Sequence, residues 1–327
     1  MVIDQNLKNS VKEAQLIIEK ARSEAAKKIV GQDGLIDGLL MGILAGGHVL
    51  VEGVPGLAKT LAVQTFADIL SVDFKRIQFT PDLLPADLTG TMIFRQQTGE
   101  FIPRKGPVFS HIVLADEVNR APAKVQSALL EAMAEKQVTI GDTTYKLPEP
   151  FFVLATQNPI EQEGTYQLPE AQLDRFIAKV LVSYPTPEEE LEIMRRVDNM
   201  DEISLSSVLD PRSIARVREI ARGIELDERV EKYIVSLVAA TREQNKRKLP
   251  FIRFIEFGAS PRATIGMMRC ARVKALMEGR AFVLPEDVQD VAKIVLRHRI
   301  VLSYEAEAEE MTADSVIDSI LSHVSVP

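Results

Sequence analysis

The chain has 327 residues, which is enough for two domains at about 150 residues each. Hydrophobic residues make up 46% and charged residues 26%, the balance of an ordinary folded soluble protein. Lys and Arg number 39 against 47 Asp and Glu, so the net charge is −8, which argues against a protein whose main role is to grip nucleic acid.

The single cysteine, Cys270, excludes an intramolecular disulfide and any metal site built from cysteines. It lies in an apolar, helix-like stretch, where we expect a buried and inert thiol. The four histidines are scattered along the chain without a ligand spacing, so we expect no structural metal.

No targeting or membrane segment is predicted. The amino-terminal segment carries the charged residues Asp4, Lys8 and Lys12 and lacks the apolar run that a signal peptide contains. The longest uncharged stretch, Gly38–Val51, is shorter than the roughly 20 residues of a membrane span. We therefore expect a cytoplasmic protein, which a partner could still bring to a membrane.

In chain order, an amphipathic helix is predicted over residues 5–28 and a second helix over about 33–44. Short apolar runs then alternate with helical patterns at about 61–70, 122–135 and 169–174. Such alternation predicts an α/β fold in which helices cover both faces of a mainly parallel sheet. The five runs that we expect to form its strands are 48–51, 74–79, 111–115, 151–155 and 176–182.

Two hairpins interrupt this alternation, one within an insertion at about 80–109 and one at 138–146. After Tyr184 only helical patterns follow, starting at Thr186, which is placed to cap a helix with Glu189 completing the capping box. The prediction is an amino-terminal helix and linker at 1–29, an α/β core at 30–184, and a smaller all-helical domain at 185–327.

A phosphate-binding loop follows the first strand and precedes a helix, which is the context that a P-loop requires. Its glycines allow backbone N–H groups to point at phosphate oxygens, and the helix N-terminus favours negative charge. Lys59 would contact the β- and γ-phosphates, and Thr60 would place its hydroxyl on Mg²⁺. Ala58 departs from the general pattern, which has glycine there. The residues assigned to nucleotide are Gly53, Val54, Pro55, Gly56, Leu57, Ala58, Lys59, Thr60 and the adjoining Leu61.

Two acids, Asp116 and Glu117, end the apolar run at 111–115. The carboxyl ends of such strands line the crevice where ligands bind. Asp116 is therefore predicted to hold Mg²⁺, and Glu117 to accept a proton from the water that attacks the γ-phosphate.

Four further polar residues complete the predicted site. Asn158 follows the next apolar strand and is placed to orient the attacking water. Arg120, Arg175 and Arg262 could meet phosphates; Arg262 lies in the first turn of a capped helix, from where it could reach back across an interdomain cleft. An arginine that stabilises transition-state charge is worth several orders of magnitude in rate.

Five segments together resemble the MoxR family of AAA+ ATPases, and the resemblance spans about residues 30–300. Ala58 is a familiar variant in that family, and Gln167 stands where the family often has Pro. The segments are Gly53–Thr60, Asp116–Pro122, Ala155–Pro159, Gly164–Phe176 and Ala259–Ala263.

The resemblance implies an AAA+ core and a helical lid with ATP or ADP and Mg²⁺ bound between them. It assigns Asn158 as sensor 1, Arg262 as sensor 2 and Arg175 as an arginine finger that acts on a neighbouring subunit. It places adenine against Val30, Gly31 and Gln32. The insertion is similar to a helix-2 insert and the second hairpin to a pre-sensor hairpin.

A finger acting in trans implies a ring, usually a hexamer, and the family is thought to act as chaperone-like ATPases on proteins with von Willebrand factor A domains. One alternative is a motor like the ATPase subunit of magnesium chelatase. A DNA-translocating ring is disfavoured by the negative charge. A guanine-nucleotide switch is disfavoured because no Asn-Lys-x-Asp motif occurs.

Overall fold

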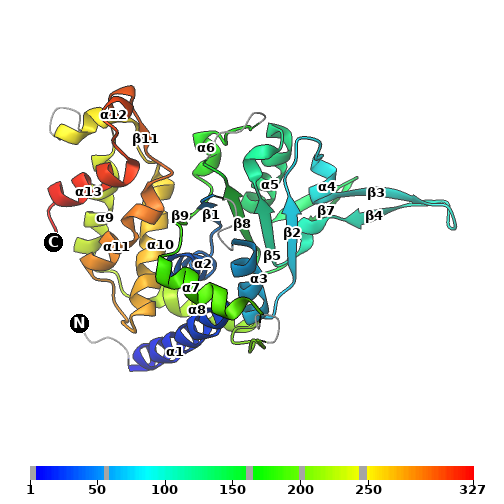
Figure 1. Cartoon of the computed structure of the whole chain (residues 1–327), viewed down its shortest axis with the longest axis horizontal. Helices are drawn as coiled ribbons and strands as arrows, with labels where there is room; N and C mark the ends of the chain where they lie inside the picture. Colours follow the sequence, from blue (N-terminus) through cyan, green and yellow to red (C-terminus); the bar gives the residue numbers. More distant parts are fainter. Residues whose placement is uncertain (1–4, 55–58, 160–164, 199–202, 243–248) are drawn as a thin grey trace.

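The computed structural model describes residues 5–54, 59–159, 165–198, 203–242 and 249–327. Its centre is a five-stranded parallel sheet in the order β2-β5-β8-β1-β9 (Figure 1). All five predicted strands are present, so the predicted α/β class with a five-stranded parallel sheet is confirmed. They are β1 (Val49–Glu52), β2 (Phe74–Gln78), β5 (Ile112–Asp116), β8 (Phe152–Gln157) and β9 (Ala178–Leu181).

Side chains of the sheet alternate between two hydrophobic clusters, as the two-residue period of a strand requires. Val49 and Val51 join the cluster that includes the helices on one face, whereas Leu50 joins the cluster on the other. Both faces are therefore buried, which explains why these strands read as continuous apolar runs. The helices of the core are α2 (Asp33–Leu44), α3 (Lys59–Leu70), α4 (Pro85–Thr89), α5 (Ala123–Glu135) and α6 (Glu170–Leu173), with 3₁₀ turns η1 (Pro107–Phe109) and η2 (Val118–Arg120).

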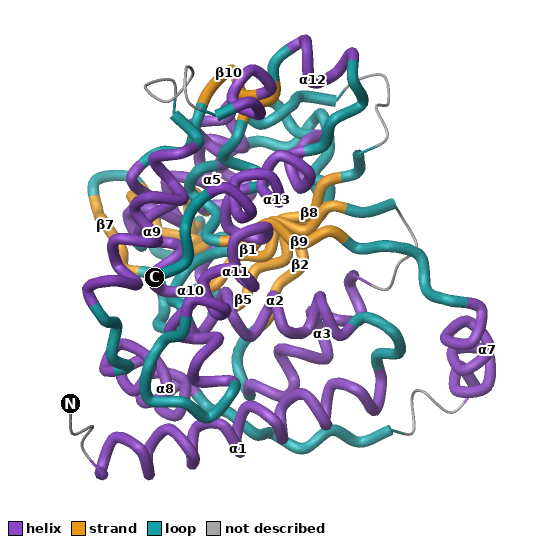
Figure 2. Tube along the Cα trace, turned by 90° about the vertical axis from the view of Figure 1, so that its left-hand side faces the viewer, coloured by secondary structure: helices purple, strands orange, loops and turns teal. Residues whose placement is uncertain are grey.

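The amino-terminal helix α1 (Gln5–Lys28) confirms the first predicted helix. It buries one face, which includes Val11, Ile18 and Ala25. Helix α1 contacts α2 and α3 of the core and also α8 and α10, which follow the core in sequence, and Figure 2 shows it running beneath both groups. The predicted boundaries at residues 29 and 184 stay predictions.

Both predicted hairpins are present. Strands β3 (Gly90–Arg95) and β4 (Glu100–Lys105) form an antiparallel ribbon that projects away from the body of the molecule (Figure 1). Phe94 and Phe101 face each other across it at 5.3 Å between ring centroids, and both are more than half exposed. The second hairpin pairs β6 (Gln137–Ile140) with β7 (Thr143–Lys146).

The part after β9 is helical, and its first helix begins at the predicted position. Thr186 and Glu189 form the predicted capping box of α7, and Asp210 and Asp227 cap α8 and α9. The helices are α7 (Pro187–Arg196), α8 (Pro211–Gly223), α9 (Glu228–Ala240), α10 (Pro261–Met277), α11 (Pro285–Leu296), α12 (Tyr304–Ala308) and α13 (Ala313–His323), with the 3₁₀ turn η5 (Pro250–Phe254).

One detail corrects the expectation of an all-helical segment. Strands β10 (Ile255–Phe257) and β11 (Val301–Leu302) pair as a two-stranded antiparallel sheet. The sequence does not reveal it because strands of two and three residues are too short to show a period. Pairing them joins η5 to the segment after α11.

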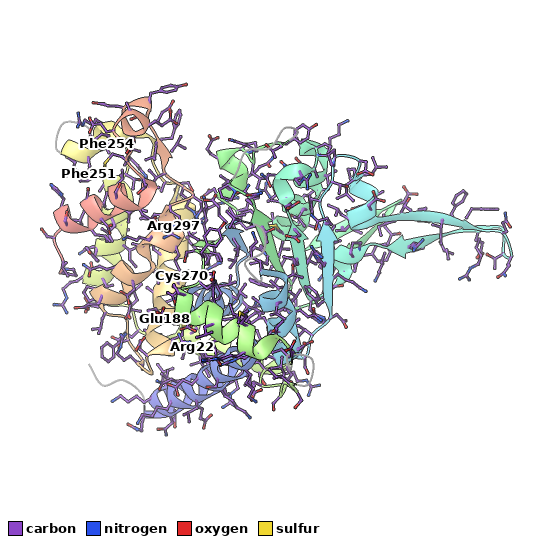
Figure 3. All side chains as sticks on the ribbon, in the orientation of Figure 1. Arg22, Glu188, Phe251, Phe254, Cys270 and Arg297 are labelled. Atoms are coloured by element: carbon purple, nitrogen blue, oxygen red, sulfur yellow. The ribbon has the colours of Figure 1, made fainter. Side chains whose placement is uncertain are left out.

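Cys270 lies on α10. Arg297 is the first residue after α11, and its side chain lies at the boundary with the core (Figure 3). The thiol is buried, and burial raises its pKa to about 12. It is therefore protonated at neutral pH, which confirms the expected inert thiol. Among the described residues no cluster of acids, histidines and cysteines suits a metal ion, and no helix has the length and apolar character that crossing a membrane requires.

His48 joins β8 to the end of α5 from within the core. Its Nδ1 accepts a hydrogen bond from the Val153 N–H (3.0 Å), and its Nε2 donates to the Met133 carbonyl (3.2 Å). The neutral imidazole has one acceptor and one donor nitrogen, and both have a hydrogen-bond partner here. Burial lowers the pKa of His48 to about 4. Burial also lowers the pKa of His298 well below its usual value.

We predict that acid destabilises the fold through these histidines. The unfolded chain takes up a proton near pH 6.5, whereas folded His48 does so only near pH 4, so stability falls as the pH drops through this interval. Between pH 7 and 5.5 the loss is about 1 kcal/mol per histidine. Urea unfolding of wild type and His48→Gln at both pH values measures it: the variant should lose less stability than wild type over that interval. An equal loss would contradict the role of His48.

Candidate nucleotide site

The carboxyl edge of the sheet gathers the predicted phosphate and metal residues. Strand β1 ends at Glu52, and the next N–H, of Gly53, donates to the Gln157 carbonyl at the end of β8 (3.3 Å). A Cβ on Gly53 would lie 2.9 Å from the Val182 carbonyl oxygen, so the close approach of the chain after β9 requires glycine here. Pro55, Gly56, Leu57 and Ala58 lie outside the described residues.

Lys59 opens α3, followed by the half-buried Thr60 and Leu61. Its ammonium donates to the carbonyls of Gly53 (2.6 Å) and Val54 (3.3 Å), so it lies against the chain that leaves β1. Desolvation lowers the pKa of Lys59, while the charges of Asp116 and Glu117 oppose this shift. The charges of Lys59, Asp116 and Glu117 therefore act on one another at the carboxyl ends of the strands.

Asp116 is buried, and both of its carboxylate oxygens have partners. Oδ1 accepts from the Thr156 hydroxyl (2.6 Å), and Oδ2 accepts from Nη2 (2.6 Å) and Nε (3.1 Å) of Arg76. A fixed carboxylate beside the hydroxyl-bearing first turn of α3 fits Mg²⁺, which binds one or two protein oxygens and keeps water and phosphate as its other ligands. Arg76 competes with a cation for Oδ2.

Glu117 follows in the left-handed conformation, with φ of 56°. Its N–H donates to the Thr156 hydroxyl (2.8 Å), so one threonine fixes both acids. Its Oε2 accepts from the Gln78 amide (3.0 Å) and from Arg120 (2.9 Å). Arg120 thus lies on the predicted base, and the Glu117 carboxylate is restrained by two neighbours.

Asn158 lies just after β8, and its carbonyl accepts from the Asn119 side chain (3.5 Å), two residues beyond Glu117. The predicted adenine segment lies at the same edge. Gln32 donates to the Ser183 carbonyl after β9 (3.3 Å), and a Cβ on Gly31 would lie 2.3 Å from the Glu189 carboxyl carbon. Val30 is half-buried beside them.

Arg175 and Arg262 are not at this edge. Both line a cavity of about 440 Å³ whose walls include Gly46, Gly47 and His48, the residues immediately before β1. Because β1 rises about 3.3 Å per residue, Gly53, which follows this strand, lies a strand length away from the cavity. Arg262 lines this cavity together with Arg175, and its Nη1 reaches across to Asp174 of the core (3.8 Å); its role at the nucleotide stays a prediction.

Asp174, next to Arg175, holds the cavity together. Its Oδ1 accepts from Nε of Arg299 (2.9 Å) and its Oδ2 from the Ser260 hydroxyl (2.8 Å), while Nη1 of Arg262 lies 3.8 Å from the same Oδ2. Ser260 also caps α10, in which Arg262 is the second residue. The Asp174 carboxylate thus contacts Arg262 and Arg299, whereas Nη1 of Arg175 donates to the Leu130 carbonyl (2.9 Å).

Arg299 is buried and spans the segment on both sides of Arg175. Besides Asp174 it donates to the carbonyls of Phe176, Ile177 and Val295. Desolvation lowers the pKa of Arg299, and the hydrogen bond to Asp174 opposes that shift. His298 adds a bond to the Phe176 carbonyl (3.0 Å). The segment before β9 is thus fixed to the helices after the core.

Sequence reasoning missed Arg76, Gln78, Thr156, Asp174 and Arg299. A sequence signal for Arg76 and Gln78 does exist. The two polar residues are two positions apart at the end of β2, so their side chains point to the same face, and β2 lies beside β5, which carries Asp116. The role of Arg299 has no local signal, because its partners lie about 125 residues earlier in the chain.

These features define an AAA-type ATPase domain with its lid. Residues 48–178 match the model of the ATPase family associated with various cellular activities (AAA), and residues 253–320 match that of the AAA lid domain.

Proteins that align with nearly the whole chain identify the family within this class. The chain is 49% identical to chaperone MoxR1 of Mycobacterium tuberculosis over 95% of this chain and 82% of that protein. It is 32% identical to protein MoxR of Methylorubrum extorquens, over 93% of both chains. A crystal structure described as that of an ATPase from Cytophaga hutchinsonii is 51% identical, covers 99% of this chain and 98% of its own, and superposes with a TM-score of 0.92. The chain belongs to the MoxR family of AAA ATPases.

We predict that the Asp174–Arg299 ion pair contributes strongly to stability. Asp174→Asn leaves a buried guanidinium without its counter-charge and should cost about 3 kcal/mol. The matched control is Asp290→Asn, which removes a half-exposed carboxylate 3.2 Å from Lys274 and should cost under about 1 kcal/mol. Chemical unfolding of both variants measures the difference, and equal costs would refute the proposed importance of the buried pair.

Proposed function

We propose that the chain is a Mg²⁺-dependent ATPase that converts ATP and water into ADP and phosphate as one subunit of a ring, usually a hexamer. The carrying observation is the division of the site. Lys59, Asp116 and Glu117 lie at the carboxyl edge of the sheet, whereas Arg175 and Arg262 line a cavity at the amino edge. The site becomes complete when the carboxyl edge of one chain meets the amino-edge cavity of the next.

Within one chain, Lys59 exchanges the Gly53 and Val54 carbonyls for the β- and γ-phosphates. Mg²⁺, held by Thr60 and Asp116, would neutralise charge on the phosphates when bound. The Glu117 carboxylate accepts the proton of the attacking water, once it is released from Gln78 and Arg120, and Asn158 orients that water. The segment from Val30 to Gln32 borders the adenine ring of the nucleotide.

The neighbouring chain supplies Arg175 and Arg262, whose positive charge stabilises the charge that develops on the phosphates. Both would therefore act in trans. Asp174, which precedes Arg175 in the chain, contacts Ser260 and Arg262 of the lid, so that movement of the lid and presentation of the two arginines are coupled.

The proposed role is chaperone-like remodelling or maturation of protein partners in the cytoplasm. Its supports are the 49% identity to a protein named a chaperone and the family resemblance, which points to proteins with von Willebrand factor A domains. The alternative is a motor for metal insertion, like the ATPase subunit of magnesium chelatase. A DNA-acting ring is disfavoured by the net charge of −8. We place the core at 30–184 and the lid at 185–327.

We predict that Glu117→Gln binds ATP but does not turn it over. The amide keeps the size of the side chain and cannot take the proton, so hydrolysis should fall about 100-fold or more. Phosphate release and nucleotide retention are the measurements, with Glu131→Gln, an exchange of the same kind on α5, as control. Turnover within about twofold of wild type would remove Glu117 as the base. Partners retained by the trapped variant identify the clients.

Mixing variants tests the divided site. Lys59→Ala chains should restore hydrolysis to Arg175→Ala chains and, separately, to Arg262→Ala chains, because mixed rings contain interfaces with both halves intact. A mixture of Arg175→Ala with Arg262→Ala should stay inactive, since each chain has lost part of the same cavity. Restored activity in that last mixture would show that Arg262 acts on the nucleotide of its own chain. Normal hydrolysis by Arg175→Ala chains alone would show that Arg175 is not the arginine finger.

A further inference from the structure

A second cavity adjoins the one that contains Arg175 and Arg262. It measures about 310 Å³ and shares Gly46, Lys136 and Arg269 with its neighbour. Its walls come from the end of α2 and from α8 and α10, so it lies between core and lid at the amino edge of the sheet. It is therefore separate from the loop that follows β1.

The charged side chains that line this cavity are all cationic, although the whole chain has a net charge of −8. Among the residues that the structure describes, none of these side chains forms an ion pair. The five are Lys136, Arg218, Arg222, Arg269 and Arg272.

Two of the five show that the arrangement is electrostatically unfavourable without an anion. Arg218 donates to the Ile43 carbonyl (2.7 Å), and desolvation lowers its pKa, with the charge of Arg222 acting in the same direction. Glu149 opposes this shift but does not line the cavity. The Nε of Arg272 is buried and has no hydrogen-bond partner. Like charges in a concave, partly desolvated wall focus a positive potential that an anion relieves.

We propose that this cavity is a second anion site, which binds a polyphosphate group carried either by a free inorganic chain or by a nucleotide. Guanidinium groups pair with phosphate oxygens through two parallel hydrogen bonds, and several phosphates in a row match several adjacent cations. A single carboxylate would neutralise only one of the five. The volume lies at the lower end of small-ligand pockets, which suits a tri- or tetraphosphate group. No residue of the P-loop lines this cavity, although three of its residues also line the cavity of Arg175 and Arg262.

The test titrates inorganic triphosphate into the full chain carrying Lys59→Ala, which removes the lysine of the P-loop, with calorimetry as the readout. We expect one triphosphate per chain and weaker binding at higher salt. Arg222→Gln/Arg272→Gln in the same background should weaken the Kd about tenfold or more. The control, Arg212→Gln/Arg216→Gln, removes the same charge from exposed positions of α8 outside the cavity and should leave the Kd within about twofold.

A parallel titration with ATP identifies the source of the phosphates. Equal affinities assign the site to the phosphate chain alone, and tighter binding of ATP assigns it to a nucleotide. Failure of triphosphate to bind, or equal losses in the two double variants, would overturn the proposal. If the Arg222→Gln/Arg272→Gln chain instead loses ring assembly without any triphosphate binding, the cavity belongs to the contact with an acidic surface of the next chain. ATP hydrolysis by the otherwise wild-type chain is measured separately and decides the proposed function by itself.

Discussion

The buried ion pair between Asp174 and Arg299 is the contact on which the arrangement of the two parts depends. Its carboxylate belongs to the segment that leads into β9, and its guanidinium follows α11 of the lid. Removing two charges from water is costly, and here the cost is offset by bonds to four backbone carbonyls besides the carboxylate. A contact with this many fixed donors and acceptors admits one geometry, so it specifies the angle at which the lid meets the core.

The same contact joins structure to function, because the residue between Asp174 and Phe176 is Arg175. The carboxylate also accepts from Ser260, which begins the helix of Arg262. Asp174 therefore links the lid helix that carries Arg262 to the core segment that carries Arg175. Their distance from the P-loop follows from strand polarity: all five strands are parallel, so residues before and after a strand lie on opposite edges.

At the carboxyl edge the acids are restrained. Thr156 bonds both Asp116 and Glu117, Arg76 neutralises Asp116, and Gln78 and Arg120 hold the Glu117 carboxylate. Substrate binding must displace some of these contacts. In the proposed mechanism, the cost of displacing these contacts limits proton transfer to Glu117 until phosphates, water and a neighbouring chain are in place.

The sequence by itself determined the parallel sheet, both hairpins, the helix start at Thr186, and the position of Asp116 at the end of its strand. These depend on local signals: apolar runs, caps, turn residues, and the rule that parallel strands end at one edge. The tertiary structure alone decided the two-residue strand β11, the partners Arg76, Gln78 and Thr156, the placement of Arg262 beside Arg175, and the cationic cavity. Each of these joins residues from separate elements, most of them distant in sequence, and their geometry depends on how the lid packs on the core, which no local pattern encodes.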